Sequence, residues 1–312
     1  MPTARHLISI DDLTDEDLDW IITRGVEHAA GLREADRTLC GQVVGVLFRA
    51  TSSRTRTAFS AGALRLGGRL VTYGPNDLQE NTGESAEDTG DVLSRMLDVL
   101  VVRTPQGDAE LRSYARQRRM AVINAMSSIE HPTQALADLT TLATRFGRVE
   151  DLTVLYVGEG NNTASALTLA LSRFPGVRLS LRTPAGYGVE RSFLDRAAIS
   201  AKQSCAVIEQ RHDLSNLPVA DVVYTTRWQT TGTTKEDPDW RTAFAPFQVN
   251  EQLMASCPGA VFMHDLPAHR GEEVTAEVLD GPASIAFDQA ENKYHSARAV
   301  LEWCSGLPGS SQ

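Results

Sequence analysis

The sequence predicts an α/β protein with two Rossmann-like domains, each with a mainly parallel sheet flanked by helices. Apolar runs typical of buried strands alternate with helical patterns along the chain. The alternation restarts after Gly147, so two β/α runs of similar size follow one another. We therefore expect a first domain over residues 1–147 and a second over 148–292. A C-terminal helix over 293–312 is expected to return to the first domain.

Each element has its own local signal. In the first half, Ser9 is a suitable cap for a helix that runs to about residue 28. Short apolar runs predict strands at 43–48, 98–103 and 121–124, and helical spacing predicts helices over 57–66 and 132–146. In the second half, the same signals predict strands at 152–157, 177–181, 222–225, 260–263 and 284–287, with helices over 163–173, 193–203 and 294–303.

Composition and charge exclude several classes of partner. The chain has 312 residues, of which 42% are hydrophobic, and a formal net charge of -10. A protein with this much negative charge repels nucleic-acid backbones and anionic lipid surfaces. Neither nucleic acid nor a membrane is therefore expected as a partner. The four cysteines form no C-x-x-C pair, and no metal or other cofactor is expected. With no signal peptide or membrane span in the sequence, we expect a cytoplasmic protein.

A dense set of anion-binding residues lies directly after the first predicted strand. The run is Ser52, Ser53, Arg54, Thr55 and Arg56, and a helix follows it. At a helix start, backbone N–H groups and the positive end of the helix dipole point at one place. The hydroxyl groups and two guanidinium groups add further hydrogen-bond donors for a phosphate. The alternative is an ordinary helix start with solvated arginines, but the number of donors favours an anion site.

Phe48 to Arg56, read as F-x-x-x-S-x-R-T-R, resembles the carbamoyl-phosphate signature of the aspartate and ornithine carbamoyltransferases. Four later blocks resemble other signatures of this family, in the family's order up to residue 292. They are His131-Pro132-Thr133-Gln134 with the following Ala-Leu-Ala-Asp; residues 77–89; Gly158-Glu159-Gly160-Asn161-Asn162; and His264-Asp265-Leu266-Pro267 with residues 287–292.

The resemblance implies transfer of a carbamoyl group from carbamoyl phosphate to an amine, with release of phosphate. Arg103 would reach the phosphate and the carbonyl oxygen, and His131 and Thr55 would hydrogen-bond that oxygen. Gln134 and the backbone carbonyl of Leu266 would hold the carbamoyl NH2 group. The catalytic residues would then be Arg103, His131, Gln134 and Thr55, and the donor site would also include Ser52, Ser53, Arg54, Arg56, Gln79 and Leu266.

The family resemblance also implies an assembly. Residues 77–85 resemble a loop that, in this family, reaches into the active site of a neighbouring subunit. A homotrimer with shared sites is therefore expected. Gln79 stands where ornithine-type members contact carbamoyl phosphate.

The expected amino-acid site departs from the ornithine type. The D-x-W-x-S-M-G segment of ornithine enzymes is Thr226 to Gly232 here, without the carboxylate that receives the α-ammonium group. Arg227 and Gln229 instead resemble the carboxylate-binding pair of aspartate enzymes, and Asp265 replaces a cysteine. A carboxylate at 265 could receive an ammonium group. The residues expected to bind the amino acid are Asn161, Asn162, Arg227, Gln229, Asp265 and Lys293.

These changes favour 2,3-diaminopropionate as the acceptor, because it has an amine, a carboxylate two carbons away and a second ammonium group between them. Ornithine, which would give citrulline, is the alternative acceptor. Two other classes stay open: a non-catalytic homologue that binds an anion, and a phosphoryl-transfer enzyme. The second lacks support because the sequence has no G-x-x-x-x-G-K-[ST] motif.

Overall fold

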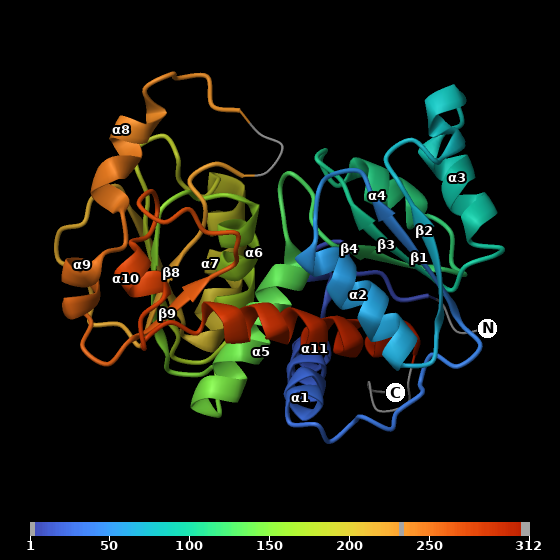
Figure 1. The fold of residues 1–312 in the computed structure, drawn as a ribbon, viewed down its shortest axis with the longest axis horizontal. Helices are drawn as coiled ribbons and strands as arrows, with labels where there is room; N and C mark the ends of the chain where they lie inside the picture. Colours follow the sequence, from blue (N-terminus) through green and yellow to red (C-terminus); the bar gives the residue numbers. More distant parts are fainter. Residues whose placement is uncertain (1–3, 231–233, 307–312) are drawn as a thin grey trace. The chain divides into compact units, whose positions relative to one another are not determined.

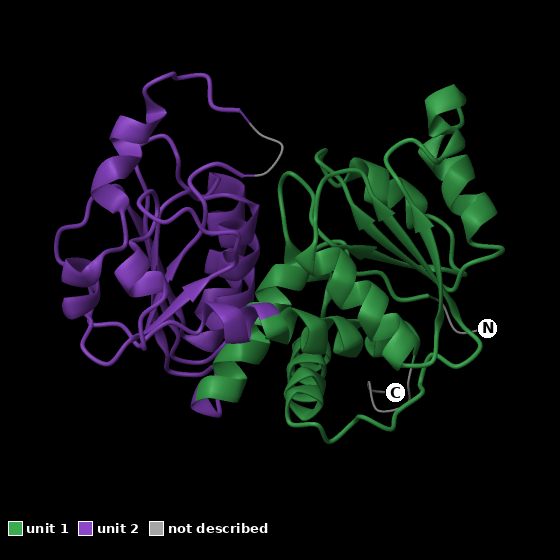
Figure 2. Ribbon diagram, viewed as in Figure 1, with its two compact units in different colours: residues 1–145, 291–312 green, residues 146–290 purple. Residues whose placement is uncertain are grey.

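The structure is a computed structural model that describes residues 4–230 and 234–306. Contacts divide the chain into two compact units, one formed by residues 1–145 and 291–312 and the other by residues 146–290 (Figure 2). Each unit contains one parallel sheet with helices around it, which confirms the predicted fold class. Within the described ranges, no helix has the length and apolar character needed to cross a membrane.

The sheet of unit 1 has four parallel strands in the order β2-β1-β3-β4 (Figure 1). These strands are β1 (Val43–Phe48), β2 (Arg69–Tyr73), β3 (Val99–Arg103) and β4 (Ala121–Asn124). The helices of this part of the chain are α1 (Asp15–Ala29), α2 (Arg54–Arg65), α3 (Ala86–Leu93), α4 (Ala109–Tyr114), α5 (Pro132–Phe146) and α11 (Ala286–Cys304), with a 3-10 turn at Ile10–Asp12 and another, η2, at Gln79–Thr82.

One face of this sheet packs against α3 and α4. Leu47, Leu100 and Val102 form a buried cluster there with Leu93 and Leu111. The remaining helices pack against one another at small residues. A Cβ atom on Gly25 of α1 would lie 2.8 Å from Thr140 Oγ1 of α5, and one on Gly62 of α2 would lie 3.2 Å from Arg298 Cγ of α11.

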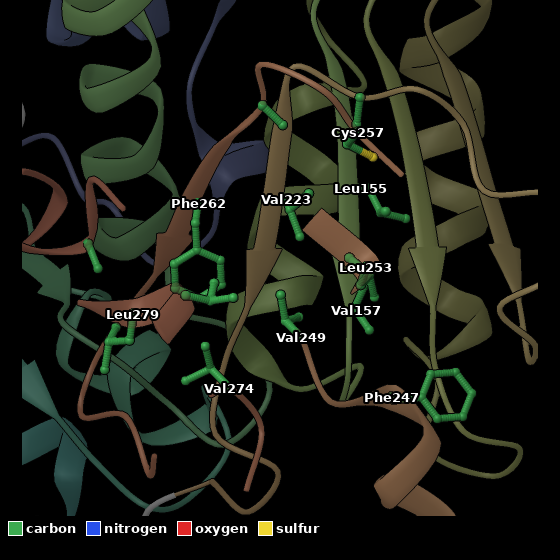
Figure 3. Close-up of a cluster of buried hydrophobic side chains, with 14 residues drawn as sticks. Leu155, Val157, Val223, Phe247, Val249, Leu253, Cys257, Phe262, Val274 and Leu279 are labelled. Carbon is green, nitrogen blue, oxygen red and sulfur yellow. The ribbon is translucent and has the colours of Figure 1, made fainter. Parts of the chain in front are cut away.

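The sheet of unit 2 has five parallel strands in the order β7-β6-β5-β8-β9. They are β5 (Thr153–Val157), β6 (Arg178–Arg182), β7 (Val207–Arg211), β8 (Val222–Thr225) and β9 (Val261–His264). The helices are α6 (Asn162–Leu171), α7 (Arg191–Ser204), α8 (Trp240–Phe244), α9 (Glu251–Ala255) and α10 (Ala276–Leu279), with the 3-10 turn η3 at Ala245–Phe247. Figure 3 shows the buried cluster in which Leu155, Val223 and Phe262 of the strands meet Leu253 and Leu279.

Some predicted element boundaries were wrong, each for a local reason. The predicted strand 284–287 is absent, because only Ser284 bridges Phe262 and the helix α11 begins at Ala286. The predicted N-terminal helix is divided into a 3-10 turn and α1, because Thr14 and Asp17 form a capping box that starts a new helix. The helix α2 begins at Arg54, three residues before its predicted start.

In both sheets the strand order reverses at one position: the first strands are added on one side of the starting strand, and the later strands are added on its other side. In unit 1 this switch lies between β1 and β3, and in unit 2 between β5 and β8. Ligands of open parallel sheets bind outside the carboxyl ends of the strands at such a point. The predicted anion-binding run follows β1, and the Gly158 to Asn162 turn follows β5.

Candidate active site

The start of α2 has the form of an anion-binding helix terminus. Ser53 is the N-cap residue, and in the described chain its side chain makes no capping hydrogen bond. By contrast, Thr14, Ser85 and Asn161 cap α1, α3 and α6 with their side chains. A helix start of this kind retains backbone N–H groups for an anion.

The other residues of the anion-binding run differ in exposure. Thr55 is buried, Ser52 and Arg54 are half-buried, and Ser53 and Arg56 are exposed. The Arg56 guanidinium lies over the Phe48 ring, with its central carbon 5.2 Å from the ring centroid. This contact places Arg56 beside the end of β1, from which the run begins.

Strand pairing places Arg103 next to this run. Phe48 at the end of β1 is in register with Arg103 at the end of β3, and the Arg49 N–H donates to the Arg103 carbonyl at 2.9 Å. Arg103 is buried, with 8% of its surface exposed. The two predicted parts of the phosphate site therefore meet at the switch point of the sheet.

His131 lies just before α5 and is buried. It lines a small cavity together with Thr55, Thr133 and Lys293. Burial lowers the pKa of His131 well below its usual value, and the nearby positive charges of Lys293 and Arg103 lower it further. The imidazole is therefore neutral at neutral pH. Thr133 Oγ1 lies 3.3 Å from its Nδ1.

Gln134 follows one helical turn into α5 and is fully buried. Its Nε2 donates to Asp138 Oδ1 at 2.7 Å, and among the described residues its Oε1 has no hydrogen-bond partner. A buried amide oxygen without a partner is costly, so a site with this arrangement is suited to an N–H donor from a ligand. The predicted role of Gln134 toward a carbamoyl NH2 group requires such an acceptor.

Gln79 begins the 3-10 turn η2, and its side chain is exposed. Its Oε1 accepts a hydrogen bond from Thr82 at 2.9 Å. The adjacent Glu80 is bound by Arg49 and by the Tyr114 hydroxyl, which hold this turn to unit 1. The partners of Glu80 lie 31 and 34 positions away in the chain, so local sequence gives no signal for these contacts.

In unit 2, Asp265 directly follows β9 and is held by two threonines. Its Oδ2 accepts from Thr163 Oγ1 at 3.0 Å, and its Oδ1 accepts from Thr226 Oγ1 at 2.9 Å. Thr226 occupies the position where the ornithine-type motif has its aspartate. Asp265 therefore contacts Thr226, the residue that stands in place of the aspartate of the ornithine-type motif.

His264 shapes the backbone that follows Asp265. Its Nδ1 accepts from the Leu266 N–H at 2.8 Å, so its Nε2 bears the proton and donates to Glu273 Oε1 at 3.2 Å. Leu266 has a left-handed backbone with φ of 52°, and the peptide bond to Pro267 is cis. Gln289 accepts from the His264 N–H at 2.8 Å, which joins the two C-terminal signature blocks.

The remaining predicted amino-acid residues are distributed over both units. Asn161 caps α6, since its Oδ1 accepts from the Thr163 and Ala164 N–H groups at 3.0 and 3.2 Å. Asn162 is buried, and Arg227 and Gln229 are half-buried after β8. Lys293 belongs to unit 1, where it lines the His131 cavity, whereas Leu266 of the predicted donor site belongs to unit 2.

Comparisons with known proteins match nearly the whole chain. Residues 5–144 match a family described as aspartate/ornithine carbamoyltransferase, carbamoyl-P binding domain, and residues 150–304 match the corresponding Asp/Orn binding domain. The ornithine carbamoyltransferase of Haloquadratum walsbyi is 38% identical over 301 residues, which cover 96% of this chain and 98% of the relative. The solved structure of ornithine carbamoyltransferase from Pyrococcus furiosus is 36% identical, covers 96% of both chains and has a TM-score of 0.90.

Proposed function

The chain belongs to the aspartate/ornithine carbamoyltransferase family and is a carbamoyltransferase, and we propose that its acceptor is the side-chain amine of ornithine. The relatives from Haloquadratum walsbyi and Halalkalibacterium halodurans cover nearly all of the chain and have the name ornithine carbamoyltransferase, as does the similar solved structure from Pyrococcus furiosus. These names favour ornithine over 2,3-diaminopropionate, the acceptor expected from the sequence.

The side chains proposed to bind carbamoyl phosphate all belong to unit 1. The start of α2 would bind the phosphate through Ser52, Ser53, Arg54, Thr55 and Arg56, and Arg103 would bridge the phosphate and the carbonyl oxygen. Because His131 is neutral, it can donate one N–H to that oxygen while Nδ1 accepts from Thr133. The Gln134 Oε1 would accept from the carbamoyl NH2 group, with the Leu266 carbonyl as its second acceptor.

The proposed chemistry needs positioning and charge stabilisation. The neutral amine attacks the carbonyl carbon, and negative charge develops on the oxygen beside Arg103, His131 and Thr55. The bond from carbon to the phosphate oxygen then breaks, and the phosphate leaves with its electron pair. The phosphate takes the proton that the amine loses, so atoms and charges balance without a covalent enzyme intermediate.

2,3-Diaminopropionate remains a second candidate because of one group of residues. Thr226 takes the place of the aspartate of the ornithine motif, and it binds Asp265, which replaces a cysteine. Arg227 and Gln229 resemble a carboxylate-binding pair. This arrangement favours a shorter acceptor with its second ammonium group close to the reacting amine.

A panel of amines tests both candidates. Purified protein is incubated with carbamoyl phosphate and each of ornithine, 2,3-diaminopropionate, aspartate and lysine, and phosphate release and the ureido product are measured. We expect the highest kcat/KM with ornithine. A higher kcat/KM with 2,3-diaminopropionate would replace ornithine by the second candidate, and no release above the rate without amine would contradict both.

We also propose a homotrimer in which Gln79 completes the donor site of a neighbouring subunit. The support is the resemblance of residues 77–85 to the family's shared loop, and its exposed position at η2. The expectation that the enzyme is cytoplasmic stays a prediction.

Mixing two inactive variants tests the shared site. Arg54→Ala and Gln79→Ala should each lose about 10²–10³-fold in kcat, because each removes a donor to the developing charge. After joint unfolding and refolding in equal amounts, about one of the three sites in each mixed trimer, or about a quarter of all sites, would have both residues intact and regain activity. Unchanged low activity after mixing, with trimers confirmed by light scattering, would contradict the shared site.

A further inference from the structure

A largely buried ion pair in unit 2 lies beside the predicted acceptor residues. Glu159 belongs to the turn after β5, two residues before Asn161, and Lys235 lies between β8 and α8. The Lys235 ammonium binds Glu159 Oε1, and the exposed fractions of the two side chains are 7% and 15%. No expected role in the proposed reaction uses either residue.

Three aromatic rings surround the same ammonium group. The Lys235 Nζ lies 4.9 Å from the ring centroid of Tyr187, 5.3 Å from that of Trp240 and 5.0 Å from that of Phe244. The rings also pack on one another, with Phe244 centroids 4.8 Å from Tyr187 and 5.4 Å from Trp240. Cation–π attraction is strongest where water is excluded, so these rings and the carboxylate together favour one position for Lys235.

Glu159 also binds the other side of the same loop. Its Oε2 accepts from Thr230 Oγ1 at 3.2 Å, while its Oε1 binds Lys235. Burial raises the pKa of Glu159, and the Lys235 ammonium and the Thr230 hydroxyl oppose this effect by stabilising the carboxylate. One carboxylate therefore joins the turn after β5 to the chain on both sides of residues 231–233.

Lys235 is the side chain that anchors its part of the loop. Its described neighbours, Thr234 and residues 236–239, are exposed. On the other side, Trp228 packs on Phe244 with ring centroids 5.6 Å apart. Arg227 and Gln229 flank Trp228 directly, so the aromatic cluster links their backbone to the place where Lys235 is bound.

We propose that Lys235 and Glu159 are positioning residues for the acceptor, because their ion pair holds the segment of Arg227 and Gln229 against the turn of Asn161 and Asn162. This inference rests on the proposed function. The pair sets the geometry of the amino-acid site and has no part in binding carbamoyl phosphate. It acts through the neighbouring segments and does not contact the reacting atoms.

A double-mutant cycle tests the proposal. The variants are Lys235→Met, Glu159→Gln and the double variant, with Lys235→Arg as the conservative change. Arg191→Ala is the matched control, because Arg191 pairs with Asp195 on the surface of α7. For each protein the KM for ornithine and the KM for carbamoyl phosphate are measured, and thermal unfolding shows that the variant is folded.

We expect each single variant to raise the KM for the acceptor by about tenfold, and the double variant to be no worse than either. The KM for carbamoyl phosphate should stay within about twofold, since all its proposed side-chain contacts come from unit 1. Lys235→Arg should restore most of the acceptor affinity because it retains the charge and the cation–π contacts. Arg191→Ala should behave as the unchanged protein.

An unchanged acceptor KM, equal rises in both KM values, or additive effects in the double variant would overturn the proposal. Hydrogen exchange of residues 226–230 and 234–240 gives a readout that is independent of turnover. If the unchanged enzyme turns over none of the tested amines, the proposed function fails, but faster exchange in Lys235→Met would still support the positioning role. Exchange equal to that of the unchanged protein would then contradict it.

Discussion

In both units, ligand-binding candidates follow the carboxyl ends of strands in a parallel sheet, but the two units hold them differently. In unit 1, Arg103 meets the start of α2 through strand register, and His131 and Thr55 line one cavity. In unit 2, side chains hold other side chains: Thr163 and Thr226 bind Asp265, and Lys235 binds Glu159.

This difference teaches how one fold can retain a donor and change its acceptor. At a helix terminus, part of the binding of a phosphate comes from backbone N–H groups, which depend little on the identity of neighbouring side chains. An amino-acid site made from contacts between loop side chains changes with each substitution in those loops. The departures from the family pattern at Thr226 and Asp265 accordingly lie in unit 2.

The largest expected effect contrasts one residue from each half. Arg103→Lys should lower kcat/KM by about 10²–10³-fold, because it removes a planar guanidinium beside the developing charge. The factor should be the same for every acceptor. Asp265→Asn should instead raise the KM for ornithine by about tenfold to a hundredfold, since it removes a charge but retains the shape. Steady-state kinetics on the amine panel measures both.

The opposite kinetic pattern in these two variants would contradict the division into a donor half and an acceptor half. If Asp265→Asn lowered kcat/KM equally for all acceptors and also raised the KM for carbamoyl phosphate, Asp265 would belong to the donor site. A change in acceptor ranking in Arg103→Lys would likewise show that the two halves do not act separately.

A smaller effect concerns the pH dependence of stability through His131. Its lowered pKa means that the folded protein does not take up a proton there as the pH falls below about 6.5, whereas the unfolded chain does. The contribution is therefore favourable above this pH and is lost as the pH falls toward the folded pKa. Between pH 7.5 and 5.5, urea unfolding should show a loss of about 1 kcal/mol that is missing in His131→Asn. Equal losses in both proteins would contradict a neutral, buried His131.

Much of the fold follows from local pattern in the sequence. The strands β1, β4 and β8 and the helix α5 have the predicted bounds, because each is a continuous apolar or strongly helical run between polar residues. The strands β2 and β7 were missed. Both lie at an edge of their sheet and include polar, partly exposed residues, so their pairing partners decide their structure.

The candidate site divides in the same way. The residues of the anion-binding run and His131-Pro132-Thr133-Gln134 are adjacent in sequence and could be identified there. The contacts of Asp265 with Thr163 and of Glu159 with Lys235 join residues 102 and 76 positions apart. Local spacing has no signal for such pairs.

By itself, the sequence determined the two β/α runs, the helix start predicted to bind phosphate and the family resemblance, because each depends on residues close together in the chain. Only the tertiary structure decided that Lys293 lines the His131 cavity, that the Gln134 acceptor oxygen has no partner among the described residues, and that Lys235 pairs with Glu159. The physical reason is burial. The charge state and the available hydrogen bonds of a polar group depend on which distant groups exclude water from it.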